Sequence, residues 1–491
     1  MRKIVASLIA SALLATPAIG LAAERVDGEQ SRSSSAAKVQ WRTPAAMQLV
    51  KTRLRYAELP IQRIIDVQGA NLSRDARRPK ATQIGIARNA TTESMGQALL
   101  ATAWQSLPAG GQAARLEVTS PLAMGLRVGL KLEGLDPRAE LRFAGSELPL
   151  GNTLLMSGSE VLKSTLPNGV FWTPVTDGQS QVIEIYLPAG VDAGRLLVRA
   201  PELSHLLTNT RRDFKIIEKI GESGSCNIDT ACQVDQLGAG FVHAKNAVAH
   251  MVYNLFNTNG SVYGTYICTG TLLNDTVPLT QVPYFFTADH CFAGGSGGVP
   301  AQNRQNVAAT LNTHWNYEAT SCRSGVSTQR TTLSGGADML FHDSNTDALM
   351  VRLRNPAPAM ATFAGWDSAP LAASSDVVAI HHPSGDAKKV SFGKHIPGQS
   401  DGYNHAAAWL QGTTEGGSSG SGLFTVDGNG QYRLRGGLYG GYASCANTGS
   451  LNNTQNIDWY SRLDVVFPQI KQYLAPQPAR SNGSQPLAVP N

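Results

Sequence analysis

The chain has 491 residues, of which 42% are hydrophobic and 16% charged, and its formal net charge is +5. This composition excludes a disordered chain and leaves room for two or three ordinary domains. The 49 glycines and 25 prolines favour a turn-rich β protein over a helical one. Residues 1–219 hold 27 Lys and Arg against 19 Asp and Glu, whereas residues 220–491 hold 14 against 17. The positive charge belongs to the first part alone, so we expect no nucleic-acid binding by the second part.

The N-terminus has the pattern of a processing signal. A basic start leads into the apolar run 4–21, and Gly20 and Ala22 stand at the spacing that a signal peptidase reads. We therefore expect a signal peptide over residues 1–23 and a secreted, extracellular protein. A membrane anchor is the alternative, but Pro17 and Gly20 interrupt the run before it could span a bilayer. No membrane contact is expected once the signal is removed.

All six cysteines lie in the second part of the chain. An even number in an exported protein predicts three disulfides, for which fifteen pairings exist. None occurs in the first 225 residues, so the chain changes character near residue 220. The six are Cys226, Cys232, Cys268, Cys291, Cys322 and Cys445.

The expected elements divide the chain at the same place. Residues 24–40 are polar and Ser-rich and are expected to be loose, whereas residues 115–200 alternate as short strands do. The polar, basic stretch 208–220 is a natural site of proteolytic separation. Many short β-like segments follow, and apolar residues at helical spacing predict one helix over 463–474. We expect a β-rich propeptide over 24–219, an all-β domain over 220–475 and a disordered tail over 476–491.

Three short motifs carry candidate chemistry. His290 follows an apolar strand, Asp347 precedes a strand, and Ser419 lies in a run of glycines and serines. A serine hydroxyl attacks a carbonyl when a base takes its proton. A neutral imidazole suits that role, and a buried carboxylate fixes the tautomer of the imidazole. The glycines allow the amides of Gly417 and Ser419 to form an oxyanion hole.

Each motif alone has a plainer interpretation. A Gly/Ser run is usually a linker, a His beside a Cys is more often structural or a metal ligand, and an Asp before a strand is usually a turn residue. Their joint occurrence in the order His, Asp, Ser favours a catalytic triad. His381 and His382 are neighbours on a strand and would point to opposite faces, so we expect them to be structural. No tetrahedral Cys/His spacing occurs, and no metal or other cofactor is expected.

Five stretches around these motifs resemble the bacterial lysyl endopeptidases, a branch of the trypsin-like serine proteases, and look closest to the pseudomonad protease IV type. The resemblance covers residues 224–474. The stretches are Ser223-Gly-Ser-Cys226, Tyr266-Ile-Cys-Thr-Gly-Thr-Leu-Leu273, Ile380-His-His-Pro-Ser-Gly-Asp386, Gly416-Gly-Ser-Ser-Gly-Ser-Gly422 and Leu434-Arg-Gly-Gly-Leu-Tyr-Gly-Gly441.

The resemblance implies a chymotrypsin-like double β-barrel with a C-terminal helix and a site between the barrels. It implies a serine endopeptidase that cuts after lysine by an acyl-enzyme mechanism, with arginine as a second candidate residue. His290 would be the general base, Asp347 the orienting acid and Ser419 the nucleophile. The implied disulfides are Cys226–Cys445, Cys232–Cys322 and Cys268–Cys291.

A pocket for lysine needs an anion at its base. The trypsin pattern places that acid six residues before the nucleophile, where this chain has Thr413. The lysyl branch carries it after the last cysteine, and the resemblance transfers the role to Asp458, with Glu415 as the rival. Tyr439, Gly440 and Gly441 would line the pocket. Some members have His at the position of Tyr439 and a Trp for which Trp409 is no convincing counterpart, so the strictness for lysine stays open.

Activation cannot use the ion pair of trypsin-like enzymes, because Ser418 stands where their Asp precedes the serine. We expect the propeptide to block the cleft, to assist folding and then to be cut off. Cleavage after Lys219 would fit processing by a lysine-specific enzyme, and Lys215 is the alternative. The expected product is a monomer whose partners are protein substrates and its own propeptide.

Two other functions remain open at this stage. A protease homologue that has lost activity would act as a secreted binding protein, although all three catalytic residues are present. A secreted esterase would use the same serine chemistry. The motif around Ser419 lacks the Gly-x-Ser-x-Gly pattern in the right register, because residue 421 is Ser, and the triad order also differs.

Overall fold

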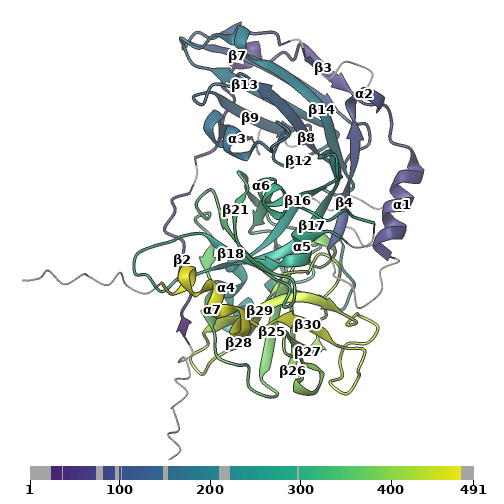
Figure 1. The fold of residues 1–491 in the computed structure, drawn as a ribbon, viewed down its shortest axis with the longest axis vertical. Helices are drawn as coiled ribbons and strands as arrows, with labels where there is room; N and C mark the ends of the chain where they lie inside the picture. The colour runs from purple at the N-terminus through teal and green to yellow at the C-terminus, as the bar shows by residue number, and fades with distance from the viewer. Residues whose placement is uncertain are drawn as a thin grey trace, which may run out of the picture.

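The structure is a computed structural model, and it is mostly β, with an N-terminal domain stacked on a C-terminal domain (Figure 1). The predicted signal peptide, the predicted cleavage site at Lys219 and the tail from residue 477 lie outside the described residues. Within the described part of the chain, no helix is long and apolar enough to cross a membrane. The structure describes residues 24–35, 37–72, 81–93, 99–100, 102–147, 153–209, 222–295 and 298–476.

The second half of the C-terminal domain is a closed barrel of six strands. The strand order is β29-β28-β25-β26-β27-β30, and the pairing of β30 with β29 closes the ring. Alternate residues of β25 face different cores, because Val377 packs with Trp409 whereas Ile380 packs with Phe424. The strands are β25 (Asp376–His381), β26 (Lys389–His395), β27 (Asn404–Gln411), β28 (Gly422–Val426), β29 (Tyr432–Gly441) and β30 (Asp458–Ser461).

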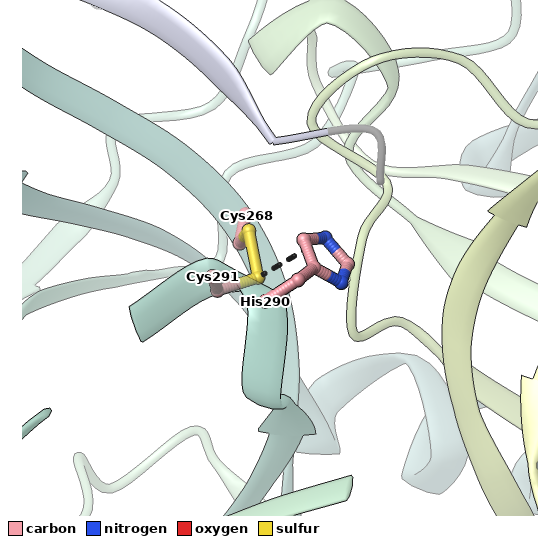
Figure 2. Close-up of side chains that lie close together, drawn as sticks. All are labelled: Cys268, His290 and Cys291. Atoms are coloured by element: carbon pink, nitrogen blue, oxygen red, sulfur yellow. Dashed lines mark hydrogen bonds between the residues drawn. A yellow bond between two sulfur atoms is a disulfide. The ribbon is translucent and has the colours of Figure 1, made fainter. Parts of the chain in front are cut away.

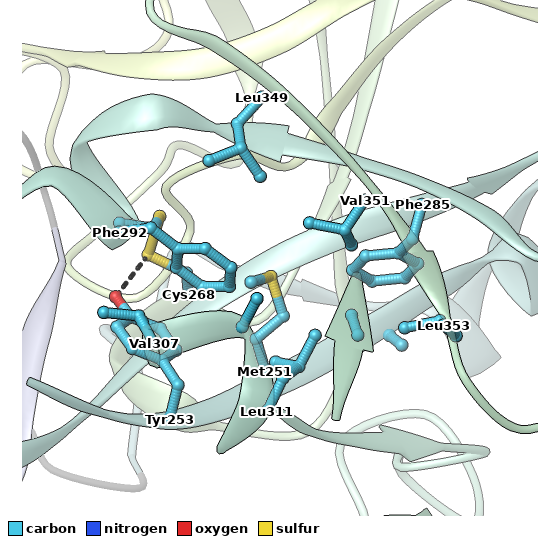
Figure 3. Close-up of a cluster of buried hydrophobic side chains, with 14 of the residues drawn as sticks. Met251, Tyr253, Cys268, Phe285, Phe292, Val307, Leu311, Leu349, Val351 and Leu353 are labelled. Carbon is cyan, nitrogen blue, oxygen red and sulfur yellow. Dashed lines mark hydrogen bonds between the residues drawn. A yellow bond between two sulfur atoms is a disulfide. The ribbon is translucent and has the colours of Figure 1, made fainter. Parts of the chain in front are cut away.

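The first half of the C-terminal domain is a half-barrel of the order β20-β19-β16-β17-β18-β22-β21. Its core gathers aromatic and aliphatic side chains from most of these strands, including Met251, Tyr253, Phe285 and Val351 (Figure 3). The strands are β16 (Val248–Phe256), β17 (Val262–Leu273), β18 (Tyr284–Ala288), β19 (Asn312–Trp315), β20 (Thr331–Leu333), β21 (Ala337–Asp343) and β22 (Ala348–Leu353).

The predicted C-terminal helix is confirmed as α7 (Leu463–Leu474). Its buried residues Leu463, Val466, Phe467, Ile470 and Leu474 recur at helical spacing and pack between the two barrels' strands. The predicted all-β fold with two barrels and this helix is therefore confirmed, and the first barrel is open. The helix α4 (Val234–Ala247) was not predicted, because Gly238, with a φ of 69°, and Gly240 interrupt its helical pattern.

The N-terminal domain contains two sheets around a core of its own. The first sheet has the order β10-β9-β13-β7-β3, and the second has the order β11-β8-β14-β4 and continues into the C-terminal domain. The main strands are β3 (Thr52–Arg55), β4 (Thr82–Asn89), β7 (Gln112–Thr119), β8 (Gly125–Glu133), β9 (Glu140–Gly145), β10 (Leu154–Ser157), β11 (Phe171–Trp172), β13 (Ser180–Leu187) and β14 (Leu197–Leu206), and the helix α1 (Ile61–Leu72) precedes β4.

The two domains share one continuous sheet. Strand β4 of the N-terminal domain pairs antiparallel with β17 of the C-terminal domain, with Thr82 opposite Ile267 and Ile86 opposite Gly264. Arg127 of β8 is fully buried beside this junction and donates to Asn254 Oδ1 at 3.3 Å and to the carbonyl of Thr310 at 2.7 Å. Backbone pairing and a buried cation thus fasten the N-terminal domain to the half-barrel.

The expectation that residues 24–40 are loose is wrong for the first of them. β1 (Arg25–Val26) pairs with β24 (Gly365–Asp367), and β2 (Glu29–Gln30) pairs with β23 (Thr362–Phe363). Ion pairs join Glu24 to Lys471 and Asp27 to Arg433. Partners more than 300 residues away order this stretch, so its own polar composition could not reveal them.

Candidate active site

His290 is held at the end of an apolar strand by a covalent link. β18 ends at Ala288, the short helix α5 (Asp289–Ala293) begins directly after it, and Cys291 of that helix is bonded to Cys268 of β17. Figure 2 shows the imidazole beside this disulfide, with Nε2 3.8 Å from Cys291 Sγ. The three side chains lie as close together as metal ligands do. Disulfide sulfurs are not thiolates, however, so the group does not form a thiolate metal site.

Asp347 fixes the orientation of His290 through both carboxylate oxygens. Oδ2 lies 2.7 Å from Nδ1 of the ring, and Oδ1 accepts the backbone N–H of His290 at 2.7 Å. Asp347 has a φ of 60°, and its own carbonyl accepts the N–H of Asp289 at 2.9 Å. Burial raises the pKa of Asp347, and the neighbouring His290 partly offsets that effect. The carboxylate oxygen beside Nδ1 favours a proton on that nitrogen, which leaves Nε2 as the nitrogen that can accept a proton.

The loop that carries Ser419 is anchored to β17. The N–H of Thr269 donates to the carbonyl of Ser419 at 2.8 Å, and Thr269 Oγ1 donates to the carbonyl of Gly417 at 2.9 Å. Gly417 has a φ of 89° and Gly420 a φ of 79°, a conformation that glycine adopts readily. A side chain on Gly420 would also collide with Thr287 Oγ1. Glycines at these positions are therefore a requirement of the loop.

Ser419 is fully buried in the full-length protein, in which the N-terminal domain is present. Its Oγ has no hydrogen-bond partner among the described residues. Within the same part of the chain, neither the amide of Gly417 nor that of Ser419 donates to another residue. The described contacts include no hydrogen bond between Ser419 Oγ and His290 Nε2. Such bonds are often long before substrate binds. The structure thus describes two available amides, a free hydroxyl and an oriented imidazole, which are the groups that acyl transfer requires.

His381 and His382 have different partners, although only His381 lies on β25, which ends there, so the expectation that both lie on a strand is wrong for His382. His381 Nδ1 lies 2.8 Å from Ser418 Oγ and its Nε2 lies 3.1 Å from Ser391 Oγ. His382 Nδ1 lies 3.0 Å from the carbonyl of Asp386, and burial holds its pKa well below the usual range. Ser418 therefore contacts a buried imidazole at the position where trypsin-like enzymes carry an aspartate.

Asp458 lies in the barrel interior with no exposed surface. Its Oδ2 accepts hydrogen bonds from Trp409 Nε1 at 2.8 Å and from Thr414 Oγ1 at 2.7 Å, and it stands opposite Gly441 in the pairing of β30 with β29. Tyr439 and Gly440 precede Gly441 on β29, and the ring of Tyr439 meets His290 edge-on at 6.1 Å. The predicted pocket residues thus lie along one strand that leads from the imidazole to the buried carboxylate.

Trp409 and Thr414 contact Asp458 from other elements, and no sequence pattern predicted a role for either in the pocket. It named Glu415 as a rival pocket anion, and the structure gives that carboxylate other partners. Glu415 Oε1 accepts the N–H of Gly224 and Asn227 Nδ2, both at 2.8 Å, and Oε2 accepts Ser384 Oγ at 2.8 Å. The carboxylate is therefore occupied in fixing the start of the C-terminal domain beside the serine loop.

The structure contains three disulfides, and they are the pairs that the family resemblance implies. Cys226–Cys445 fastens the start of the C-terminal domain to the loop after β29, and Cys232–Cys322 joins the region before α4 to the loop after β19. The paired cysteines are 219 and 90 residues apart in the sequence, respectively, so each disulfide closes a long loop. Such cross-links restrict the unfolded chain.

Comparisons with known proteins cover nearly the whole chain. The family "Lysyl endopeptidase, C-terminal domain" matches residues 220–461, and "Lysyl endopeptidase N-terminal domain" matches residues 55–207. A lysyl endopeptidase of Pseudomonas aeruginosa is 33% identical over 480 residues, which are 95% of this chain and 96% of that protein.

Two solved structures share lower similarity. The HtrA-type protease AlgW with a tripeptide is 16% identical, with a TM-score of 0.30, over 48% of this chain and 62% of that chain. An inactive mutant of a Mycobacterium tuberculosis protein is 15% identical, with a TM-score of 0.29, over 53% of this chain and 99% of that chain. The two domain matches and the identity across almost the full length carry the assignment: the chain belongs to the lysyl endopeptidase family and is a serine endopeptidase.

Proposed function

We propose that the C-terminal domain is a secreted endopeptidase that hydrolyses peptide bonds on the carboxyl side of lysine through Ser419, His290 and Asp347. The observation that carries the proposal is the double contact of Asp347 with His290, at 2.7 Å from each oxygen, and the serine loop with its two available amides is the second support. No second activity is needed to account for this arrangement.

The chemistry would run in two steps. His290 Nε2 takes the proton of Ser419 as Oγ attacks the scissile carbonyl, and the amides of Gly417 and Ser419 stabilise the oxyanion. The same proton passes to the leaving amine, and an acyl-enzyme forms. Water then hydrolyses the ester with His290 again as base. Asp347 stays ionised and stabilises the imidazolium in both steps.

Asp458 is the residue we propose to set the preference for lysine. Its carboxylate is buried and accepts hydrogen bonds from the uncharged donors Trp409 and Thr414. A lysine ammonium that reached this carboxylate would form a desolvated ion pair, whose loss costs about 2–5 kcal/mol.

We expect Asp458→Asn to lower kcat/KM on a lysyl peptide by roughly 100- to 1000-fold. The amide oxygen of Asn can still accept from Trp409 and Thr414, so the change removes charge and leaves the packing. The measurement is kcat/KM on matched peptides with Lys, Arg or Leu before the scissile bond. Glu415→Gln is the control, which should reduce stability and keep the lysine preference. The pocket assignment is refuted if the preference survives Asp458→Asn and disappears in Glu415→Gln.

The N-terminal domain is proposed to be the propeptide, removed by a cut after Lys219. Ser223 donates through its N–H and its hydroxyl to Asp386, at 3.0 and 2.7 Å, and Gly224 donates to Glu415. A cut before residue 222 would leave these anchors intact. N-terminal sequencing of the mature protein should give Ile220 as the first residue, and a start outside residues 213–221 would exclude processing at this stretch.

The few lysines of the C-terminal domain and their burial support a lysine-directed activity, because such a domain would resist self-digestion. Of the five lysines in residues 220–491, Lys245, Lys388 and Lys389 are buried, with at most 7% of their surface exposed. Lys388 Nζ donates to the carbonyl of Lys245 at 2.6 Å, and Lys245 lies 2.7 Å from Glu318. Burial lowers the pKa of Lys388 to about 7, although Glu318 partly offsets the effect.

The lowered pKa of Lys388 predicts a pH-dependent stability. Between about pH 7 and the ordinary lysine pKa of about 10.4, the unfolded chain binds a proton there that the folded protein does not bind. Lys388 therefore increases the free energy of unfolding as pH rises from about 7 to about 10.4, and this contribution is lost as pH falls through the same window. We expect Lys388→Met to flatten the rise in thermal midpoint between pH 7 and 10, measured in the Ser419→Ala background. Lys394→Met, at a partly exposed lysine, should leave the slope unchanged, and an unaltered slope in Lys388→Met would contradict a neutral buried amine.

A further inference from the structure

The junction between β4 and β17 leads into the candidate active site. Going along β17 toward Thr269, the strand passes Ile267 and then Cys268, whose disulfide partner follows His290. Thr269 holds the serine loop through both of its hydrogen bonds to Ser419 and Gly417. The pairing edge of β17 therefore runs directly into the reactive loop.

The side chain of Ile267 ties this edge to the oxyanion loop. Its Cδ1 lies 3.1 Å from the place that a Cβ on Gly417 would take. Thr82, the first residue of β4, is directly opposite Ile267, and Gln83 is opposite Tyr266. Ala81, just before the strand, packs against the core cluster that contains Cys268 and Cys291. The amino end of β4 thus lies at the active site and its carboxyl end leads away.

Strand β4 runs away from the active site, as the part of a substrate that follows the scissile bond would. Because the pairing is antiparallel, one step back from Thr82, of about 3.3 Å, leads to Ala81 and toward Cys268, whose disulfide partner follows His290. Ala81 is the described residue of this segment that lies nearest in register to the serine loop's anchor on β17, so the peptide bond on its amino side is the one that we expect to meet Ser419. In the sequence the residue before Ala81 is Lys80, which lies outside the described residues. Residues 24–219 contain only seven lysines, so a lysine directly before Ala81 in the sequence would arise by chance only rarely.

We propose that β4 binds as the leaving-group side of a substrate and that Lys80–Ala81 is an internal processing site, cut by the chain's own Ser419. The inference rests on the proposed lysine-directed activity and deepens it. Ser419 Oγ bonds to the carbonyl carbon of Lys80, the bond to the nitrogen of Ala81 breaks, and His290 passes the serine proton to that amine. One water then hydrolyses the ester, which frees the carboxylate of Lys80 and restores Ser419.

The cut would not by itself release the N-terminal domain. The new amino end at Ala81 is the start of a strand that stays paired with β17, and Arg127 still donates to Asn254 and Thr310. The expected product is a nicked complex in which the leaving-group half of the cleft remains filled. Removal of the fragment beyond Ala81 is then a separate, slower step of activation.

The test follows freshly purified full-length protein by intact mass spectrometry and N-terminal sequencing. We expect a fragment that begins Ala81-Thr82-Gln83, formed at a rate that does not change over a 100-fold dilution, since the reaction is within one chain. Lys80→Gln should slow its formation by about 100-fold or more. Lys51→Gln, at an exposed lysine of the same domain, should leave the rate unchanged.

The outcomes separate this inference from the proposed function. Each mature protein is also assayed on a lysyl peptide in solution. Lysyl-peptide cleavage without an Ala81 fragment, or with a fragment whose formation speeds up with concentration, would overturn the internal processing site and leave the proposed function standing. A mature protein inactive on lysyl peptides would overturn both.

Discussion

Replacing Ser419 with Ala should lower kcat on a lysyl peptide by about five to six orders of magnitude and leave KM nearly unchanged. The hydroxyl is the atom that bonds to the substrate, whereas the amides of Gly417 and Ser419 remain in place to bind the carbonyl oxygen. Ser419 is fully buried beside β17, so loss of one oxygen should not disturb the fold.

The measurement is burst and steady-state kinetics of the mature domain, with labelling by a serine-directed organophosphonate. Ser450→Ala, at an exposed serine, is the matched control and should react like the parent protein. Activity retained in Ser419→Ala would remove the nucleophile assignment. A correctly processed parent protein that neither cleaves nor reacts would revive the interpretation of an inactive, binding homologue.

The second large effect is expected for Asp347→Asn, at about 10⁴-fold in kcat. Asp347 accepts two donors, the backbone N–H and the ring N–H of His290, one on each oxygen. Asn offers one oxygen and one NH₂ group. If the oxygen keeps the backbone N–H, the NH₂ faces Nδ1, which must then accept, and the ring proton moves to Nε2. The nitrogen that should take the proton of Ser419 would then already carry one.

This mechanism predicts a loss in kcat with little change in KM, because substrate binding does not involve Asp347. Asp376→Asn, at an exposed carboxylate on β25, is the control and should retain full activity. A fall of less than about ten-fold in Asp347→Asn would show that the orientation of His290 does not depend on this carboxylate, and the acid would have to be sought elsewhere.

The sequence by itself predicted the candidate chemistry of the site and set the order of its candidate residues along the chain. A His, an Asp and a Ser in this order are local signals, because each sits in a short motif whose glycines or apolar strand can be read directly. The even count of cysteines predicted three disulfides, and the resemblance to a family supplied their pairing. The amphipathic spacing of α7 was likewise sufficient to predict that helix.

The tertiary structure decided which distant groups meet. Asp458 is buried under Trp409 and Thr414, which precede it by 49 and 44 positions, and Glu415 is occupied by the residues at the start of the C-terminal domain. The pairing of β4 with β17 joins segments about 180 residues apart, and a shift of one residue would bring a different peptide bond to Ser419. Local patterns state that a segment is a strand, but its partner and register follow from side-chain packing across the whole fold, which no single stretch of sequence contains.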